Sequence, residues 1–320
     1  MKRIGVLTSG GDASGMNPAL RAVVRTAIVS GLEVVGIERG YEGLLNGWFR
    51  PMNLSSVGGI INRGGTILRT ARSERFKSEE GLQIAGNALR EQGIDGLVVI
   101  GGDGSFRGAA RLQEVSGIPV VGIPATIDND IGGTEYTLGY DTALQVAMDA
   151  IDKIRDTADS FERLFVIEVM GRSRGFIAAA VGLAGGAEAI LVPEIPFDPA
   201  QICERLRRGM ARGKRSAIIV TAEGAAKASE VATFVEMYLR EEVRATVLGY
   251  TQRGGSPTAM DRIMGSRFGA LAVELLLKGK SGMMTALRGN EVIPVPLSAS
   301  WQEPRVLDER LLKLNEVLAS

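Results

Sequence analysis

The sequence contains no histidine among its 320 residues. This absence excludes a Ser-His-Asp triad, an imidazole general base and histidine ligands to a metal. A general base must therefore be a carboxylate, or else a lysine, a tyrosine or the single cysteine, Cys203. One cysteine cannot form an internal disulfide or a zinc cluster, and a chain without disulfides is typical of the cytoplasm.

The chain also lacks a net charge and long apolar segments. Lysine plus arginine and aspartate plus glutamate are balanced at 37 each, so bulk charge favours neither nucleic acid nor a membrane as a partner. No apolar stretch approaches the length of a membrane span. The first residues lead directly into a predicted strand without the pattern of a signal peptide, so we expect a cytoplasmic protein.

Apolar strand-length segments alternate with helix-length segments along the chain, which predicts a mainly parallel α/β fold. Functional residues are then expected in loops at the carboxyl ends of the strands. The segments 39–72 and 131–136 are expected to be irregular, the second as a flexible connector. Strands are predicted at 3–8, 32–37, 97–100, from 118, 164–169, 189–192, 217–221, 244–250 and as a pair in 283–295. Helices are predicted at 17–30, 79–92, after 105, 139–159, after 175, 199–211, 228–240, 258–278 and 307–318.

The loop after the strand at 97–100 is rich in glycine and carries an acid. Gly101 and Gly102 allow the backbone to approach a ligand closely. Ser105 is a suitable N-cap for the next helix, whose free N–H groups would suit a phosphate. Asp103 would repel a bare phosphate, so we interpret it as a ligand to a magnesium ion that lies between the two charges.

A second acidic loop follows the next predicted strand. Asp128 and Asp130 are two residues apart, and in an extended chain this spacing directs both carboxylates to one side. Together the two loops indicate phosphoryl transfer. The alternative at this point is that both are polar loops that close an ordinary α/β unit. Standard nucleotide cradles are incomplete, because Arg107 interrupts the dinucleotide fingerprint and Glu274 interrupts the P-loop pattern.

Six segments identify a family more specifically. They occur in this order: Leu7-Thr-Ser-Gly-Gly-Asp-Ala-Ser-Gly-Met-Asn17, Ile100-Gly-Gly-Asp-Gly-Ser105, Pro124-Ala-Thr-Ile-Asp-Asn-Asp130, Val169-Met-Gly-Arg172, Thr221-Ala-Glu223 and Leu248-Gly-Tyr-Thr-Gln-Arg-Gly-Gly-Ser-Pro257. Over essentially the whole chain they resemble the bacterial ATP-dependent 6-phosphofructokinases. A single Gly-Gly-Asp-Gly is weak, since NAD kinases and diacylglycerol kinases share it, but the ordered set is highly specific.

The resemblance implies a fold of two similar Rossmann-like lobes. Each would be a mainly parallel sheet flanked by helices, with the active site in the cleft between the lobes. The ATP-binding lobe would comprise residues 1–138 and 251–301. The sugar-phosphate-binding lobe would comprise residues 139–250 and 302–320.

The resemblance also implies the reaction, which is transfer of the γ-phosphoryl group of Mg-ATP to the 1-hydroxyl of fructose 6-phosphate in glycolysis. Asp128 would be the general base, with Thr126 and Asp130 beside the transferring group and Arg72 and Arg172 offsetting its charge. Asp103 would bind Mg²⁺. The ATP phosphates would be held by Gly11, Arg72, Gly102, Asp103, Gly104 and Ser105.

The sugar phosphate would be bound by residues of two subunits of a homotetramer. Residues of one subunit would be Thr126, Asp128, Met170, Gly171, Arg172, Glu223, Tyr250 and Arg253. The neighbouring subunit would add Arg163 and Arg244, since arginine binds phosphate through its planar fork. A second nucleotide site would lie between subunits, where ADP would activate the enzyme and phosphoenolpyruvate would inhibit it. Its residues would be Arg21, Arg25, Arg155, Glu188, Arg212 and Lys214.

Three positions depart from the family pattern. Ala125 replaces the usual glycine of ATP-dependent enzymes, which adds a methyl group near the phosphates. Tyr250 replaces the substrate-side histidine and cannot carry positive charge near neutral pH. An effector-site arginine is missing near Asn53 and Leu54, which argues for weaker regulation.

Other functions remain open from the sequence. The nearest are transfer from pyrophosphate, and phosphorylation of a related sugar phosphate such as tagatose 6-phosphate. An NAD kinase or lipid kinase fits the Gly-Gly-Asp-Gly loop alone. A non-catalytic sensor of sugar phosphate or nucleotide is a further alternative, although Asp103, Asp128 and Arg172 are all present.

Overall fold

The structure is a computed structural model that describes residues 1–319. It separates into two compact units, each built around its own sheet. Unit 1 contains Met1–Thr142 and Arg253–Arg305, and unit 2 contains Ala143–Gln252 and the chain from Val306 onward.

Within the described residues, the sheet of unit 1 has seven strands in the order β11-β10-β5-β4-β1-β2-β3. Strands β2, β1, β4, β5 and β10 are parallel, whereas the edge strands β3 and β11 are antiparallel to their neighbours. The strands span Arg3–Thr8 (β1), Glu33–Ile37 (β2), Phe49–Met52 (β3), Gly96–Gly101 (β4), Val120–Pro124 (β5), Met283–Arg288 (β10) and Glu291–Pro296 (β11).

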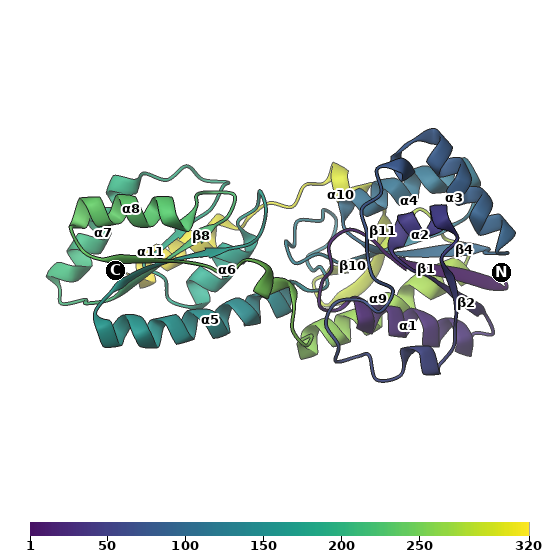
Figure 1. Cartoon of the computed structure of the whole chain (residues 1–320), viewed down its shortest axis with the longest axis horizontal. Coiled ribbons are helices and arrows are strands. Elements are labelled where there is room, and N and C mark those ends of the chain that lie inside the picture. The colour runs from purple at the N-terminus through teal and green to yellow at the C-terminus, as the bar shows by residue number, and fades with distance from the viewer. Residues whose placement is uncertain (320) are drawn as a thin grey trace. The chain divides into compact units, whose positions relative to one another are not determined.

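Helices cover both faces of this sheet, which explains why the central strands are continuous apolar runs. Helices α1 and α9 pack together on one face, and α2, α3 and α4 cover the other (Figure 1). Every residue of β4 is buried. The helices span Met16–Val29 (α1), Gly40–Asn46 (α2), Glu79–Glu91 (α3), Asp103–Ser116 (α4), Ala259–Leu277 (α9) and Ala299–Gln302 (α10), with 3-10 turns at Ser55–Val57 and Arg75–Lys77.

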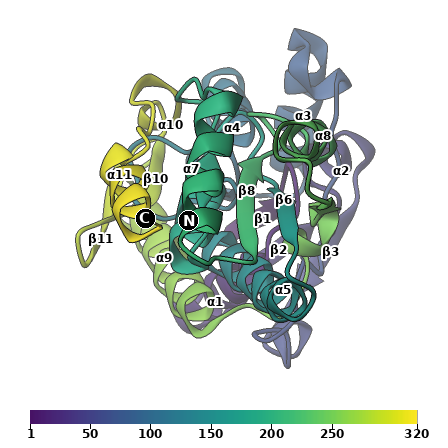
Figure 2. The ribbon, with the colours of Figure 1, turned by 90° about the vertical axis from the view of Figure 1, so that its left-hand side faces the viewer.

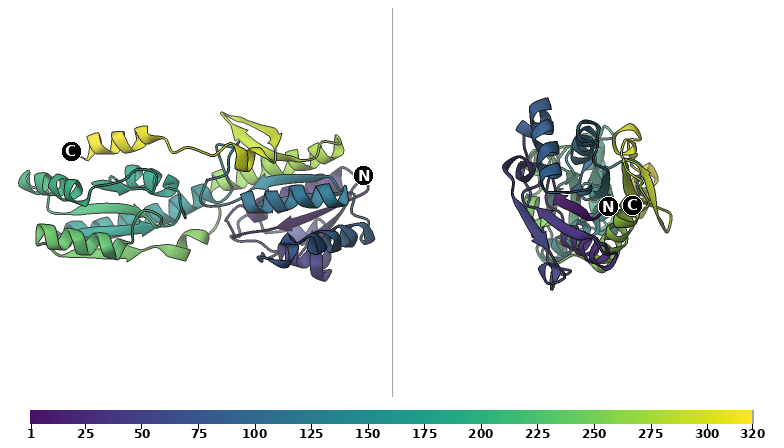
Figure 3. Two further views of the ribbon diagram at one scale, coloured as in Figure 1. Left: turned by 90° about the horizontal axis from the view of Figure 1, so that it is seen from above. Right: turned by 90° about the vertical axis from the view of Figure 1, so that its right-hand side faces the viewer.

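Unit 2 is built on a smaller sheet, in which four parallel strands of the described chain follow the order β7-β8-β6-β9. Helices α7 and α8 cover one face, and α5 and α6 lie on the other (Figures 1 and 2). The C-terminal helix α11, yellow in Figure 3, packs beside α6 and β7. These elements span Tyr140–Phe161 (α5), Leu164–Val169 (β6), Phe176–Ala184 (α6), Ala189–Leu191 (β7), Pro199–Ala211 (α7), Ala217–Ala222 (β8), Ala228–Leu239 (α8), Val243–Val247 (β9) and Glu309–Leu318 (α11).

The predicted α/β class, with mainly parallel sheets flanked by helices, is confirmed. No helix in residues 1–319 is long and apolar enough to cross a membrane. The strand predicted at 244–250 is too long, because β9 ends at Val247 and Gly249–Arg253 form a 3-10 turn that begins with a positive φ of 51° at Gly249.

The prediction of irregular structure throughout 39–72 is wrong, because this segment contains α2 and β3. Its glycines suggested a loop, but they serve close packing. A Cβ on Gly43, inside α2, would lie 1.8 Å from the carbonyl oxygen of Glu38. Pro51 in β3 is compatible with an edge strand, where an unpaired N–H position is available.

The segment 131–136 is likewise not a flexible connector. Most of it is buried, and it is hydrogen-bonded to β10. The N–H of Glu135 donates to the carbonyl of Leu287 at 2.9 Å, and the Thr134 hydroxyl accepts the Leu287 N–H at 3.0 Å. The glycines at 132 and 133 therefore mark close packing instead of freedom.

Residues 136–142 are fastened to the start of α9 by a buried carboxylate. Asp261 accepts hydrogen bonds from the Tyr136 hydroxyl at 2.8 Å, the Gly139 N–H at 2.7 Å and the Thr142 N–H at 3.0 Å. Burial raises the pKa of Asp261, and these hydrogen bonds oppose that rise. These contacts fix the chain up to Thr142, the last residue of unit 1 before the chain continues into unit 2.

Candidate active site

Loops from three adjacent parallel strands of unit 1 gather at one edge of the sheet. They follow β1, β4 and β5, which are neighbours in the sheet. The chain runs from β1 outward to β2 and then returns to β4 on the other side of β1. This reversal makes the space after β1 and β4 the topological switch point, where α/β sheets bind ligands.

Backbone contacts lock these three loops together. The Ser9 N–H donates to the Ile100 carbonyl at 2.9 Å, and the Ala125 N–H donates to the Gly101 carbonyl at 2.9 Å. A Cβ on Gly101 would lie 2.5 Å from the Ser9 carbonyl oxygen. The three loops therefore pack directly against one another. Position 101 must be glycine, because its backbone lies so close to the Ser9 carbonyl.

The predicted N-cap role of Ser105 is wrong. Helix α4 begins two residues earlier, at Asp103, with Gly102 at the N-cap position. Ser105 is buried inside the first turn, and its hydroxyl donates to the Ser9 hydroxyl at 3.0 Å. The error arose because serine suits both a cap and a buried contact between loops, and the sequence does not separate the two.

Asp103 lies on the first turn of α4 with 52% of its side chain exposed. Its carboxylate is 3.8 Å from the Arg107 guanidinium, a weak surface ion pair that a stronger cation could replace. No group of three or more metal-binding side chains occurs in residues 1–319. This arrangement fits Mg²⁺ that binds one carboxylate and takes its other ligands from phosphates and water.

The loop from Thr126 to Asp130 carries the second set of carboxylates. The Thr126 hydroxyl accepts the Asp128 N–H at 3.2 Å and donates to the Asp128 carboxylate at 3.3 Å. Asp128 is only 1% exposed. The expected extended chain between Asp128 and Asp130 is absent, because Asn129 has a left-handed φ of 51°. A turn, and not strand geometry, sets the directions of the two carboxylates.

Three further predicted residues lie in unit 1. Arg253 packs on the β1 loop, where its guanidinium donates to the Asp12 carbonyl at 3.2 Å and is 3.6 Å from the Asp12 carboxylate. A Cβ on Gly11 would lie 2.4 Å from that guanidinium. Arg72 is exposed and follows Thr70, whose hydroxyl donates to the Gly10 carbonyl at 2.7 Å.

In unit 2, loops after β6 and β8 bring together several predicted sugar-side residues. Glu223 accepts the N–H groups of Gly171 at 3.2 Å and Arg172 at 2.7 Å through one carboxylate oxygen. Gly171 and Arg172 both have positive φ, at 136° and 52°. Gln252, which the sequence did not single out, accepts the Met170 N–H at 2.8 Å. The sequence feature that could have identified Gln252 is its position next to Arg253 in the Gln-Arg-Gly-Gly segment.

Tyr250 lies on the 3-10 turn after β9 and is 82% exposed. Arg163 and Arg244 occupy the opposite, amino end of the same sheet. Arg163 precedes β6 and pairs with Glu242 at 3.0 Å, and Arg244 in β9 pairs with the same carboxylate. Since β6 rises about 3.3 Å per residue, its two ends are separated by roughly 17 Å. Of the predicted sugar-side arginines in unit 2, Arg172 thus lies at one end of the sheet and Arg163 and Arg244 lie at the other.

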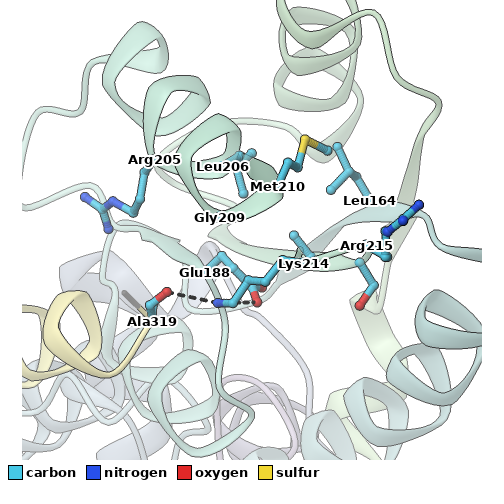
Figure 4. Close-up of a pocket in the computed structure, with 11 residues that line it drawn as sticks. Leu164, Glu188, Arg205, Leu206, Gly209, Met210, Lys214, Arg215 and Ala319 are labelled. Atoms are coloured by element: carbon cyan, nitrogen blue, oxygen red, sulfur yellow. Dashed lines mark hydrogen bonds and ion pairs between the residues drawn. The ribbon is translucent and has the colours of Figure 1, made fainter. Parts of the chain in front are cut away.

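Some of the predicted effector residues also cluster in unit 2. Glu188 accepts the Ile218 N–H at 2.6 Å and lies 3.5 Å from the Lys214 ammonium, which also donates to the Ala319 carbonyl at 3.0 Å (Figure 4). Arg155 donates to the carbonyls of Gly185 and Gly186, just before Glu188. Arg212 is exposed at the end of α7.

The other predicted effector residues, Arg21 and Arg25, lie one turn apart on α1 in unit 1 and are half-buried. At the position where the sequence lacks the expected effector-site arginine, Asn53 hydrogen-bonds to the 3-10 turn Ser55–Val57. Its side-chain oxygen accepts the Ser56 N–H at 3.0 Å.

The parallel α/β sheets, glycine-rich switch-point loops and buried carboxylate define a class of protein suited to phosphoryl groups. The chain belongs to the phosphofructokinase family, whose family model matches residues 3–276. The family resemblance predicted from the ordered segments is therefore confirmed.

Similar proteins of known name match the chain from end to end. It is 56% identical over 321 residues to ATP-dependent 6-phosphofructokinase 1 of Thermus thermophilus, covering 100% of both proteins. It is 54% identical over 319 residues to the ATP-dependent 6-phosphofructokinase of Shouchella clausii, again covering 100% of both.

Solved structures agree on the fold. Phosphofructokinase from Saccharomyces cerevisiae superposes with a TM-score of 0.89 at 35% identity, over 99% of this chain and 46% of that chain. The pyrophosphate-dependent phosphofructokinase from Marinobacter aquaeolei gives a TM-score of 0.89 at 25% identity, over 99% of this chain and 88% of that one.

Proposed function

We propose that the chain is an ATP-dependent 6-phosphofructokinase. It transfers the γ-phosphoryl group of ATP to the 1-hydroxyl of fructose 6-phosphate, giving ADP and fructose 1,6-bisphosphate in glycolysis. The observation that carries this proposal is the end-to-end identity of 54% and 56% to proteins of that name. The cytoplasm is the proposed location, since glycolytic enzymes act there.

Asp128 is the proposed general base that accepts the proton of the 1-hydroxyl. In a chain without histidine a carboxylate is the first candidate for this step, and Asp128 is a buried one. The Thr126 hydroxyl and the turn at Asn129 hold this side chain at the edge of the sheet, beside the loops of β1 and β4. Asp130, on the other side of the turn, is proposed to lie next to the transferring group.

The ATP phosphates are proposed to bind at the switch point of unit 1, against Gly11, Gly102, Gly104 and the first turn of α4. The N-terminus of this helix favours negative charge. Asp103 would hold Mg²⁺, which neutralises charge on the phosphate oxygens when it is bound. Arg72 and Arg172 are proposed to offset the charge that spreads over the transferring group.

The sugar phosphate is proposed to use the loops of unit 2, with unit 1 as the ATP-binding lobe. Met170, Gly171, Arg172 and Glu223 would contact the sugar. Tyr250 and Arg253 would bind the 6-phosphate. In unit 2 the separation between the two ends of β6 supports the proposal that Arg163 and Arg244 serve a site of a neighbouring subunit.

A homotetramer with a second nucleotide site between subunits follows from the same proposal. Lys214, Glu188 and Arg155, which approach one another in unit 2, would form part of this site with Arg212 and with Arg21 and Arg25. ADP is the proposed activator and phosphoenolpyruvate the proposed inhibitor. Because Asn53 hydrogen-bonds to a turn where the family has an arginine nearby, we expect the response to be weak.

Ala125 favours ATP over pyrophosphate as the donor. It has no positive charge that could bind pyrophosphate. It is only 2% exposed, so its methyl group is packed inside unit 1.

A coupled assay that crosses two donors with two acceptors tests the proposed function. ATP and pyrophosphate are each combined with fructose 6-phosphate and tagatose 6-phosphate, with Mg²⁺ and then with excess chelator. We expect the highest kcat/KM for ATP with fructose 6-phosphate, and loss of turnover without Mg²⁺. Turnover with pyrophosphate alone would contradict the proposal. Addition of ADP and phosphoenolpyruvate in the same assay measures regulation.

A further inference from the structure

A segment near the end of unit 1 packs against the chain that follows Asp128. The N–H of Gly132 donates to the Ser300 carbonyl at 3.3 Å. A Cβ on Gly132 would lie 1.9 Å from the carbonyl oxygen of Glu303 and 2.5 Å from that of Ala299. Only glycine permits this approach, so the segment that contains Ala299 and Glu303 lies directly on the chain just after the carboxylate loop.

Arg305 ends this segment and reaches the loop itself. Its Nη1 donates to the carbonyl oxygen of Asn129 at 3.1 Å. The side chain is half-buried, which lowers the pKa of Arg305, while Tyr140, Glu135 and Asp130 act in the opposite direction. An arginine remains protonated under such conditions. The loop therefore has a fixed positive charge against its backbone, close to Asp130.

Asn129 is the residue through which this contact acts. It is 1% exposed and has a left-handed φ of 51°, a sparsely populated conformation for a residue other than glycine. Its side-chain oxygen accepts the Thr137 N–H at 3.1 Å, and its carbonyl accepts Arg305. Such a conformation persists only where the surroundings hold it, and these two contacts hold the side chain and the carbonyl of Asn129.

Tyr140 completes the surroundings of the turn. Its phenol hydrogen-bonds to the Asn129 side chain, and burial raises the pKa of Tyr140 to about 12, so the phenol remains neutral. The residues around Asn129 therefore include a neutral phenol that hydrogen-bonds to its side chain and a guanidinium that donates to its carbonyl.

We propose that Arg305 is a positioning residue for phosphoryl transfer. It holds the carbonyl of Asn129 and so fixes the turn that sets the directions of Asp128 and Asp130. The inference rests on the proposed function, because it assigns Arg305 to that reaction. Arg305 acts through the loop and not on the reacting atoms.

The test compares Arg305→Met and Arg305→Lys with the unmodified full-length chain. Arg310→Met is the matched control, because Arg310 is an exposed arginine on α11 that pairs with Asp308. Two readouts are used: steady-state kinetics with ATP and fructose 6-phosphate, and hydrogen exchange at the amides of 127–133. A displaced loop typically costs up to about a hundredfold in rate.

For Arg305→Met we expect kcat to fall about tenfold to a hundredfold, with KM for ATP nearly unchanged and faster exchange at 127–133. Arg305→Lys should recover part of the rate, since lysine can donate to one carbonyl but lacks the planar fork. Arg310→Met should match the unmodified chain in both readouts.

Two results would overturn the inference. One is a kcat for Arg305→Met within about twofold of the unmodified value, below the loss expected of a displaced loop. The other is a loss of kcat without faster exchange at 127–133. If Arg305→Met does not fold, Arg305→Lys decides, and a kcat equal to that of the unmodified chain overturns the inference. If the unmodified chain has no turnover, the proposed function fails, whereas the exchange measurement still tests the contact.

Discussion

At the scale of single residues, the proposed reaction depends most on Asp128. Its carboxylate is buried, and the Thr126 hydroxyl both donates to it and accepts its backbone N–H. We predict that Asp128→Ser lowers kcat by about 10² to 10⁴-fold, the usual contribution of a general base. The dissociation constant of fructose 6-phosphate should change little, since a base accelerates chemistry and not binding. Stopped-flow turnover and equilibrium titration measure the two quantities.

The control for this substitution is Asp149→Ser. Asp149 is exposed on α5, where it accepts a hydrogen bond from Gln145 at 2.7 Å, so its loss should leave kcat unchanged. Near-normal turnover in Asp128→Ser would contradict the assignment of the base.

Tyr250 carries a separate prediction, about sugar-phosphate affinity. Because it is 82% exposed, its replacement should not disturb the fold. We predict that Tyr250→His lowers KM for fructose 6-phosphate by about fivefold below pH 6.5, where a charged hydrogen bond replaces a neutral one. Tyr250→Phe is the matched variant and should raise KM slightly. An unchanged KM in both variants would mean that Tyr250 does not contact the phosphate.

At the scale of elements, two adjacent glycines at the end of β4 differ in how much space is available for a side chain. A Cβ on Gly101 would lie 2.5 Å from the Ser9 carbonyl oxygen, whereas a Cβ on Gly102 would meet nothing within 4 Å. We predict that Gly101→Ala lowers the free energy of unfolding by about 1–3 kcal/mol, because the β1 loop must shift. Gly102→Ala should cost less stability, because it only weakens the N-cap of α4, and should raise KM for ATP, because its methyl would face the phosphates.

Chemical denaturation and ATP kinetics of both variants check this pair. The two substitutions introduce the same methyl group one residue apart, so each is the control for the other. Equal stability of the two variants would show that the β1 and β4 loops do not constrain each other.

Most elements could be predicted from the sequence, because buried parallel strands are apolar runs bounded by glycine. The exceptions have physical reasons. Glycine in 39–72 resembles a loop signal, yet Gly43 is needed where α2 touches the Glu38 carbonyl. Ser105 resembles an N-cap, but it is buried against Ser9. The turn at Asn129 could not be predicted, since it is held by residues far along the chain, such as Arg305.

At the scale of the whole molecule, the sequence predicts a set of site residues but not how they are arranged. Ordered segments named Asp103, Asp128 and Glu223, and the structure places each at the carboxyl end of its strand or just beyond it. The residues that orient these loops, Gln252 and Arg305, were missed. Their contacts join segments 82 and 176 residues apart, which no local pattern reveals.

The separation of Arg172 from Arg163 and Arg244 in unit 2 leads to a prediction about assembly. Arg172 follows the carboxyl end of β6, whereas Arg163 and Arg244 lie at the amino end of the sheet and share Glu242. If each active site combines one chain's Arg172 with a neighbour's Arg163 and Arg244, two inactive variants can complement each other. Arg172→Met and the double variant Arg163→Met with Arg244→Met are therefore produced separately and together.

In a symmetric two-chain interface, each mixed pair contains one intact site and one site with both defects. Random mixing should then restore roughly one quarter of the unmodified activity, far above either variant alone. The control is each variant mixed with itself, which should gain nothing. Activity of the mixture no higher than that of its parents would show that every site is built from a single chain, because each site would then retain one defect.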